Sequence, residues 1–557
     1  MASNDLVSTL KKRFAPQRIL QPGTREYSDA VFIGNLNYRM TMPAAVVQAR
    51  SVHEVQEIVA IARQSGTRLT VKNGGHSYMG YCLNEGGIVL DMSLMNDCSI
   101  DTAAMTVTIQ GGAIWKTVYK ALLKENDQYI IIGGQCPDVG ASGFTLGGGL
   151  SPFSRSYGLG CDNLLSMTVV TADSEVVTVS RDDEDEARRD LFWALTGGGG
   201  GNFGVTVEMT CKIHKLSDED GNVVCGDLTW KLPQQQELFQ KAMDAFNSKE
   251  CPNELTVDAL WTHGKRKQFT GGMTVIYNGG MTKAREVLAD YLALEPSKIS
   301  LEEMKWIDWV EHSEGWDTRS QVYHHHASFI FAEKAITREV TTKIYQLVSE
   351  AAGLLGITGS NDKDTPKCHV LWDHIGGQTT QVAPEDTAFF WREGHYVSTI
   401  KLQWTDVSKR DKVMEFIAKC KAELLPYAIQ QKAAYLNYID GTVLDWQEAY
   451  YGNNYPRLQR VKTVWDPTNF FWNMQSIRPL DGGIDGDARV IHEDLPVPTP
   501  KEILASAGVQ QVRKWWNAYA PRVTPESLGT LDSEGQAIDK DCEIRKCILA
   551  GNVNGHH

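Results

Sequence analysis

Three short stretches carry side chains that could do chemistry. The first, TVKNGGHSYMGYC, places His76 between a glycine pair and a Ser-Tyr pair. The second, GGQCPDVG, contains Cys136, and the third, YLNY, ends at Tyr438. Glycines on either side let a backbone approach a ligand closely and offer amide donors to it. His76 could be a metal ligand, a general base, a cofactor anchor or an ordinary loop histidine, and its own loop leaves all four open.

Other motifs are excluded by their context. Residues 199–204, GGGNFG, match GxGxxG, but a dinucleotide fingerprint needs a strand before it and a helix after it. Here DLFWALTG before the motif is predicted helical and VTVEMTCKI after it is predicted to be a strand. The run His324-His325-His326 cannot bind one metal ion together, because neighbours on a strand point to opposite faces. No Walker A loop and no GxSxG elbow occur.

The elements around these stretches predict how they are positioned. AVVQA is a predicted strand, SVHE carries a capping box, and a helix follows until Gly66. RLTVKN is a strand that runs directly into the His76 loop, and residues 130–165 form a glycine-dense segment. From about residue 215 to 435, tryptophans, helices and alternating strands replace the glycine-dense loops. We expect a second domain there, covering a site built by the first.

Bulk properties narrow the class of protein. A chain of 557 residues favours two domains, and a net charge of -14 without a basic stripe argues against a nucleic-acid partner. The polar N-terminus lacks a signal-peptide core, and no apolar run is long enough to span a membrane. Eleven cysteines at scattered spacings, and no Asn-x-Ser/Thr sequon, favour a cytoplasmic enzyme. A secreted mature form is the alternative.

The motifs, taken together and in order, resemble those of the berberine bridge enzyme-like family of FAD-linked oxidases, in the vanillyl-alcohol oxidase superfamily. KNGGHSY, GQCPDVG, GGG, YGL and DN follow the family's order in the first 165 residues. NFGV, YLNY and QSI resemble its later elements. The resemblance covers about residues 40–480. It implies an α+β fold with a two-subdomain, PCMH-type FAD-binding domain and an α+β substrate domain, whose antiparallel sheet is covered by helices.

The resemblance also implies domain limits and a cofactor. We expect the FAD-binding domain at 38–215, the substrate domain at 216–440, a returning C-terminal segment at 441–490 and a peripheral extension at 491–557. FAD would be attached twice, through His76 to its 8α-methyl group and through Cys136 to C6. The other expected cofactor contacts are Lys72, Asn73, Gly74, Gly75, Ser77, Tyr78, Pro137, Val139, Gly140, Ser142, Gly143, Gly147, Gly148, Tyr157, Leu159, Asn163, Gly204, Val205, Asn437 and Gln475.

The same resemblance assigns the chemistry. Tyr438 would be the base, and its pKa would have to fall from about 10 for that role near neutrality. Asp373 would assist it, although a turn aspartate is equally compatible with the sequence. The substrate would lie against Tyr78, Gln135, Leu150, Thr399, Gln403 and Tyr435. No metal is expected.

We therefore expect an oxidase that transfers a hydride from a small hydroxylated or phenolic metabolite to FAD, with dioxygen regenerating the flavin and forming hydrogen peroxide. An oligosaccharide or sugar oxidase that forms a lactone is the first alternative. A redox-neutral cyclase or isomerase is the second. The expected partners are the small substrate and dioxygen, with no nucleic acid and no membrane, and we expect a monomer.

Overall fold

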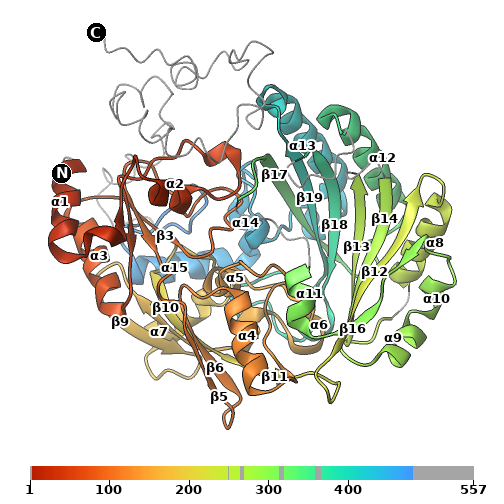
Figure 1. Ribbon diagram of the computed structural model, residues 1–557, viewed down its shortest axis with the longest axis horizontal. Coiled ribbons are helices and arrows are strands. Elements are labelled where there is room, and N and C mark those ends of the chain that lie inside the picture. Colours follow the sequence, from red (N-terminus) through yellow and green to blue (C-terminus); the bar gives the residue numbers. More distant parts are fainter. Residues whose placement is uncertain (1–2, 249, 264–268, 313–318, 358–364, 481–557) are drawn as a thin grey trace.

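The computed structural model describes residues 3–248, 250–263, 269–312, 319–357 and 365–480. The extension predicted at 491–557, with its expected helix near VQQVRKWWNAYA, lies outside the described residues. Figure 1 shows two smaller sheets with their helices on one side of the molecule and a large sheet on the other. The predicted α+β fold class is confirmed, because mixed helices surround sheets that are mainly antiparallel.

Two sheets build the first domain. The four-stranded sheet has the order β1-β2-β4-β3, with β2, β4 and β3 parallel; its strands are β1 (Ile19–Leu20), β2 (Ala45–Gln48), β3 (Leu69–Lys72) and β4 (Ile88–Asp91). The antiparallel five-stranded sheet has the order β5-β6-β10-β8-β9; its strands are β5 (Cys98–Asp101), β6 (Thr106–Gln110), β8 (Leu164–Val170), β9 (Val176–Ser180) and β10 (Val205–Lys212). A short pair joins β7 (Tyr129–Ile130) to β11 (His214–Lys215). Residues ahead of 38 also belong here, since β1 extends the first sheet.

Helices pack against these sheets with the apolar spacing that the sequence shows. Ser51 caps α3 by accepting a hydrogen bond from the Glu54 amide, and Val55, Ile58 and Val59 are fully buried. The helices of this half are α1 (Ser3–Arg13), α2 (Arg25–Val31), α3 (Val52–Gln64), α4 (Trp115–Glu125), α5 (Ala141–Leu146), α6 (Ser154–Tyr157) and α7 (Glu186–Leu195).

The second domain is built on an eight-stranded antiparallel sheet. Its order is β15-β12-β14-β13-β18-β19-β17, and β16 pairs with β12 beside that path. The strands are β12 (Val223–Leu232), β13 (Leu255–His263), β14 (Phe269–Tyr277), β15 (Lys298–Ile299), β16 (Glu302–Met304), β17 (Tyr323–Ala332), β18 (Lys367–His374) and β19 (Gly394–Trp404). Its helices are α8 (Gln236–Ser248), α9 (Met281–Val287), α10 (Ala289–Leu292), α11 (Trp306–His312), α12 (Arg338–Leu355) and α13 (Arg410–Leu424).

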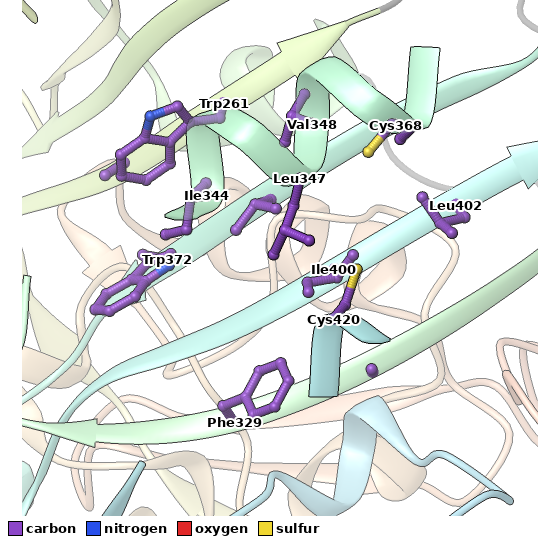
Figure 2. Close-up of a cluster of buried hydrophobic side chains, with 14 of the residues drawn as sticks. Trp261, Phe329, Ile344, Leu347, Val348, Cys368, Trp372, Ile400, Leu402 and Cys420 are labelled. Carbon is purple, nitrogen blue, oxygen red and sulfur yellow. The ribbon is translucent and has the colours of Figure 1, made fainter. Parts of the chain in front are cut away.

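One face of the large sheet is a hydrophobic layer under α12 and α13. Figure 2 shows Ile344, Leu347 and Val348 of α12 directed at the strands that carry Trp372 and Ile400. Because side chains alternate along a strand, the residues between these apolar positions must face the other way. The opposite face of β13, β18 and β19 is therefore free to carry polar groups.

The end of the described chain returns to the first domain. It contains the 3-10 turn η9 (Leu436–Tyr438) and the helices α14 (Trp446–Tyr451) and α15 (Tyr455–Trp465). Lys462 on α15 is fully buried beside Asp466, and its ammonium donates to the carbonyl oxygens of Asn202 and Phe471. Through these bonds α15 holds the GGGNFG turn of the first domain in place.

Candidate active site

A cavity of about 1360 Å³ lies between loops of the first domain and the polar face of the large sheet. Loops carrying His76 and Cys136 line one side of it. Strands β13, β18 and β19 line the other with Asp258, Asp373 and Lys401. The three stretches that the sequence singled out therefore meet at one cavity.

The His76 and Cys136 loops touch each other, and glycine makes that contact possible. A Cβ added to Gly74 would lie 2.3 Å from the Asp138 carbonyl oxygen, and one added to Gly140 would lie 2.5 Å from the Asn73 side chain. Asn73 also donates from Nδ2 to the Gly111 carbonyl oxygen at 2.7 Å. No larger residue fits at either glycine without moving a loop.

In the YLNY element, Tyr435 and Asn437 stabilise neighbouring loops, and Tyr438 lines the cavity. The Tyr435 hydroxyl accepts hydrogen bonds of 3.1 Å from the amides of Gly149 and Leu150, and another of 3.1 Å from Asn437 Nδ2. Asn437 Nδ2 also donates to the Phe144 carbonyl oxygen at 2.9 Å. Tyr435 and Asn437 thus fix the glycine-dense segment, while the turn η9 directs Tyr438 toward the sheet.

Tyr438 and Asp373 form the central polar pair of the cavity. The Tyr438 hydroxyl donates to Asp373 Oδ2 at 2.9 Å. Enclosure in the cavity and the neighbouring carboxylate of Asp373 raise the pKa of Tyr438 well above its usual value. The expectation that the Tyr438 pKa falls is therefore wrong: no cation reaches its hydroxyl in the described residues, and the group beside it is an acid.

The pKa of the buried Asp373 carboxyl is higher than that of a solvent-exposed aspartate. Burial, followed by the charge of Asp258, raises the pKa of Asp373 well above its ordinary range. Asp258 lies opposite on the neighbouring strand β13, and burial raises its pKa to about 6. Asp258 Oδ2 accepts from Gln135 Nε2 at 3.3 Å, and Gln135 Oε1 accepts from Trp309 Nε1 at 3.0 Å. Through the first of these bonds Gln135, the residue before Cys136, contacts the Asp258 carboxylate.

Side chains on β19 (Gly394–Trp404) alternate between the cavity and the helix layer. Thr399, Lys401 and Gln403 on β19 line the cavity, whereas Ile400 and Leu402 pack in the helix layer. The remaining predicted substrate contacts, Tyr78, Gln135, Leu150 and Tyr435, also line it. Tyr78 stacks on His326 with ring centroids 3.8 Å apart and lies 5.9 Å from the Tyr438 ring.

The structure divides the expected cofactor contacts into two groups. Those that line the cavity are Asn73, Gly74, Gly75, His76, Ser77, Tyr78, Cys136, Val139, Gly140, Ser142, Gly143, Gly204, Asn437 and Gln475. Those that lie behind its wall in the described structure are Lys72, Pro137, Gly147, Gly148, Tyr157, Leu159, Asn163 and Val205.

Packing and local bonds account for the position of this second group, and their contact with the cofactor stays a prediction. Asn163 Nδ2 donates to the backbone carbonyls of Tyr157 and Leu159, so these three fix one turn. Leu159 and Val205 are fully buried in apolar clusters. A Cβ on Gly147 would meet Asn437 at 2.0 Å, so its missing side chain serves packing against YLNY.

Asp258 was not among the residues expected at the site, although the sequence carries a signal for it. In LTVDALW an aspartate occupies a strand that is otherwise apolar, and a buried acid on such a strand is typical of a site. The described residues contain no group of three or more His, Cys, Asp or Glu side chains that could hold a metal ion. Among the described helices, none is long and apolar enough to cross a membrane.

The cavity also fits an elongated cofactor. Gly143 and Gly201 line it, and a Cβ added to either would meet no protein atom within 4 Å, so the space beside both glycines is cavity. Several further glycines, with Asn73 and Ser142, line the same cavity. Backbone amides at this density suit a group that carries phosphates, such as FAD.

Comparison with known proteins shows which class of enzyme the chain resembles. A model of an FAD binding domain matches residues 43–180, and a model described as berberine and berberine like matches residues 434–478. The chain is thus an FAD-linked oxidoreductase. These two models, and relatives named berberine bridge enzyme-like, agree with the resemblance to that family that the sequence motifs carry.

Relatives match over most of their length. An uncharacterized FAD-linked oxidoreductase, YgaK, of Bacillus subtilis (strain 168) is 27% identical, over 83% of this chain and 97% of that protein. Reticuline oxidase of Eschscholzia californica is 25% identical, over 80% and 85%. Berberine bridge enzyme from Eschscholzia californica superposes with a TM-score of 0.72 at 21% identity, covering 87% of this chain and 100% of that one. At that identity the structural match shows the fold alone.

Proposed function

We propose that this protein is an oxidase that takes a hydride from a small hydroxylated or phenolic metabolite to FAD attached through His76 and Cys136. The observation that carries the proposal is the Tyr438–Asp373 hydrogen bond, which lies in the same cavity as His76 and Cys136. A proton-accepting pair thereby faces the two candidate anchors across the space where a substrate would lie.

The two anchors have the setting that attachment requires. His76 and Cys136 are on separate loops that Gly74 and Gly140 allow to touch, so both could reach one ring system. His76 would be bonded to the 8α-methyl group and Cys136 to C6. Two bonds to one ring would fix its orientation relative to Tyr438.

The pair then determines how the substrate proton leaves. With both pKa values raised, Tyr438 keeps its proton at neutral pH and donates it toward Asp373. As the substrate hydroxyl gives its proton to the Tyr438 oxygen, the Tyr438 proton moves to Asp373 Oδ2. Tyr438 is the contact with substrate, and Asp373 is the acceptor.

When bound, FAD would accept the hydride from the substrate carbon and pass both electrons to dioxygen, forming hydrogen peroxide. The residues of the chain bind the substrate, hold its hydroxyl at Tyr438 and keep bulk water out of the cavity.

The test is a substrate screen with the flavin-loaded protein. Alcohols, phenols, hydroxy acids and reducing sugars are incubated with the enzyme while oxygen uptake, peroxide and product mass are followed. We expect one peroxide per substrate and a product two hydrogens lighter. A product of unchanged mass without oxygen uptake would replace the oxidase by the redox-neutral alternative, and turnover confined to reducing sugars would favour the lactone-forming one.

A further inference from the structure

Three adjacent strands place basic side chains next to one another on the cavity face of the sheet. In the strand register, His326 on β17 pairs with Lys401 on β19, and Lys401 pairs with His369 on β18. Lys367 lies two residues before His369 on the same face. All four line the cavity, and we call them the basic array.

Lys401 is the charged centre of the basic array. Within the part of the chain that the structure describes, its ammonium makes no hydrogen bond and no ion pair with a carboxylate, and the acidic group that acts on it is the Cys136 thiol. Its place inside the cavity, away from bulk water, lowers the pKa of Lys401 to about 8, so the side chain is still mainly protonated at neutral pH. An enclosed ammonium without a counter-ion is unfavourable, and an anionic ligand would remove that cost.

The two histidines supply neutral donors on either side of that charge. His326 is 3% exposed, and neither ring nitrogen has a hydrogen-bond partner among the described residues. Burial lowers the pKa of His326 well below its usual value and that of His369 to about 3, so both rings are neutral. A neutral imidazole still offers one N–H donor, which suits an oxygen of an anion held at Lys401.

We propose that the basic array binds a carboxylate of the substrate, so that the substrate is a hydroxylated carboxylic acid. This inference rests on the proposed function in one respect, namely that the oxidised hydroxyl lies at Tyr438. The Lys401 ammonium lies between two neutral donors, and the second lysine of the array, Lys367, lies two residues from His369, an arrangement that suits a carboxylate. No arginine lines the cavity in the described structure, although arginine's bidentate fork is the group most suited to phosphate.

The strand register also limits the substrate's length. Val397, four residues along β19 from Lys401, pairs with Asp373, so Lys401 and Asp373 are separated by about 13 Å along the strands at roughly 3.3 Å per residue. The lysine side chain can shorten this span by several ångströms. A carboxylate and a hydroxyl on opposite ends of a ring-sized scaffold fit, whereas a 2-hydroxy acid is too short.

Ligand binding to the flavin-loaded protein tests the inference without turnover. Benzoate, benzamide and phenyl phosphate are titrated while the visible absorption of the flavin is recorded. We expect benzoate to perturb the spectrum at least tenfold more tightly than benzamide. Lys401→Met should raise the benzoate Kd at least tenfold and leave the benzamide Kd unchanged, and His326→Phe, which keeps an aromatic ring beside Tyr78, should raise the benzoate Kd several-fold. Lys419→Met, at an exposed lysine paired with Glu350, is the matched control and should bind like the wild type.

Several results would overturn the inference. These are no spectral change with benzoate, equal affinity for benzoate and benzamide, or an unchanged benzoate Kd in Lys401→Met. A phenyl phosphate Kd tenfold below that of benzoate would reject the carboxylate in favour of a phosphate. An altered flavin spectrum in Lys401→Met with an unchanged benzoate Kd would assign the lysine to the cofactor.

A measurement on the unmodified protein covers the case in which the variants fail to fold. Between pH 6.5 and 9.5 the benzoate Kd should rise as Lys401 loses its proton, and a flat profile would contradict the inference. The titratable groups that face Lys401 from its neighbours are His326 on β17, Lys367 and His369 on β18, and Cys136 in its loop. The benzoate titration needs no substrate, so its outcome is independent of turnover. If benzoate binds through Lys401 but the protein consumes no oxygen with any substrate, the proposed function is contradicted and the carboxylate site is still supported.

Discussion

The Tyr438 hydroxyl donates a hydrogen bond of 2.9 Å to Asp373, while Asp258 lies opposite Asp373 on the next strand. The three groups form one chain, in which each member acts on the pKa of its neighbour. Burial raises the pKa of Asp373, and the Asp258 charge raises it further. The pKa values of both carboxylates are thus raised, that of Asp258 to about 6, and Tyr438, whose pKa is raised as well, keeps its proton between substrate and acid.

Replacing Tyr438 by Phe should slow flavin reduction by roughly 10²- to 10⁴-fold, the usual contribution of a positioned acid or base. The ring remains to pack against Tyr78 and Tyr435, so the flavin should stay bound. Anaerobic stopped-flow with a substrate from the peroxide screen measures the rate. Tyr157→Phe is the control, since that hydroxyl bonds to the Lys215 carbonyl outside the cavity, and it should reduce normally. An undiminished rate in Tyr438→Phe would remove Tyr438 from the proton path.

Replacing Asp373 by Asn should change the pH profile as well as the rate. A carboxyl with a raised pKa accepts a proton only above that pKa, so the wild-type reduction rate should rise with pH through an acidic limb. Asn cannot accept the proton, so the variant should be slow and should lose that limb. An acidic limb that persists unchanged in Asp373→Asn would show that another group titrates.

Asp258→Asn tests the coupling between the two carboxylates. Without the negative charge opposite it, Asp373 should ionise more readily, and the acidic limb of the reduction rate should move to lower pH. Asn can still accept through its Oδ1 from the His374 amide, which now donates to Asp258 at 3.0 Å. An acidic limb at the same pH in Asp258→Asn as in the wild type would show that the Asp258 charge does not affect the pKa of Asp373.

Lys462→Met should destabilise the fold by about 3–5 kcal/mol, because Asp466 would be left buried without its partner. The Asn202 carbonyl of the GGGNFG turn would lose a donor too, so flavin retention should weaken along with stability. Denaturant unfolding, followed by tryptophan and flavin fluorescence, reports both. Lys419→Met, at its exposed ion pair, should leave the midpoint unchanged. Equal midpoints for the two variants would contradict a structural role for Lys462.

Much of the local structure could be predicted from sequence because it depends on neighbours in the chain. Ser51 caps its helix, and Thr399, Lys401 and Gln403 share the cavity face as strand alternation requires. The proximity of Asp258 and Asp373, each next to the paired residues Ala259 and Trp372, could not be predicted, since their strands are separated by more than a hundred residues and alternation alone does not say which strands pair.

The direction of the Tyr438 pKa also depends on tertiary contacts. A sequence shows that a tyrosine is present, but whether a cation or an acid lies beside it is decided by the sheet that faces it. The surroundings of Leu159, Asn163 and Val205 likewise depend on tertiary contacts. Their positions in the motifs suggested contact with the cofactor. All three are buried, and their contact with the cofactor stays a prediction.

The most direct test of the account is the mass of the flavin peptides. The protein is precipitated in acid, washed, digested and analysed by mass spectrometry, with His76→Ala and Cys136→Ala in parallel. We predict a yellow pellet and one flavin species joined to the peptides of both His76 and Cys136, with each variant retaining flavin on the other residue alone. A colourless pellet with free FAD in the supernatant, or flavin on any other residue, would contradict the account.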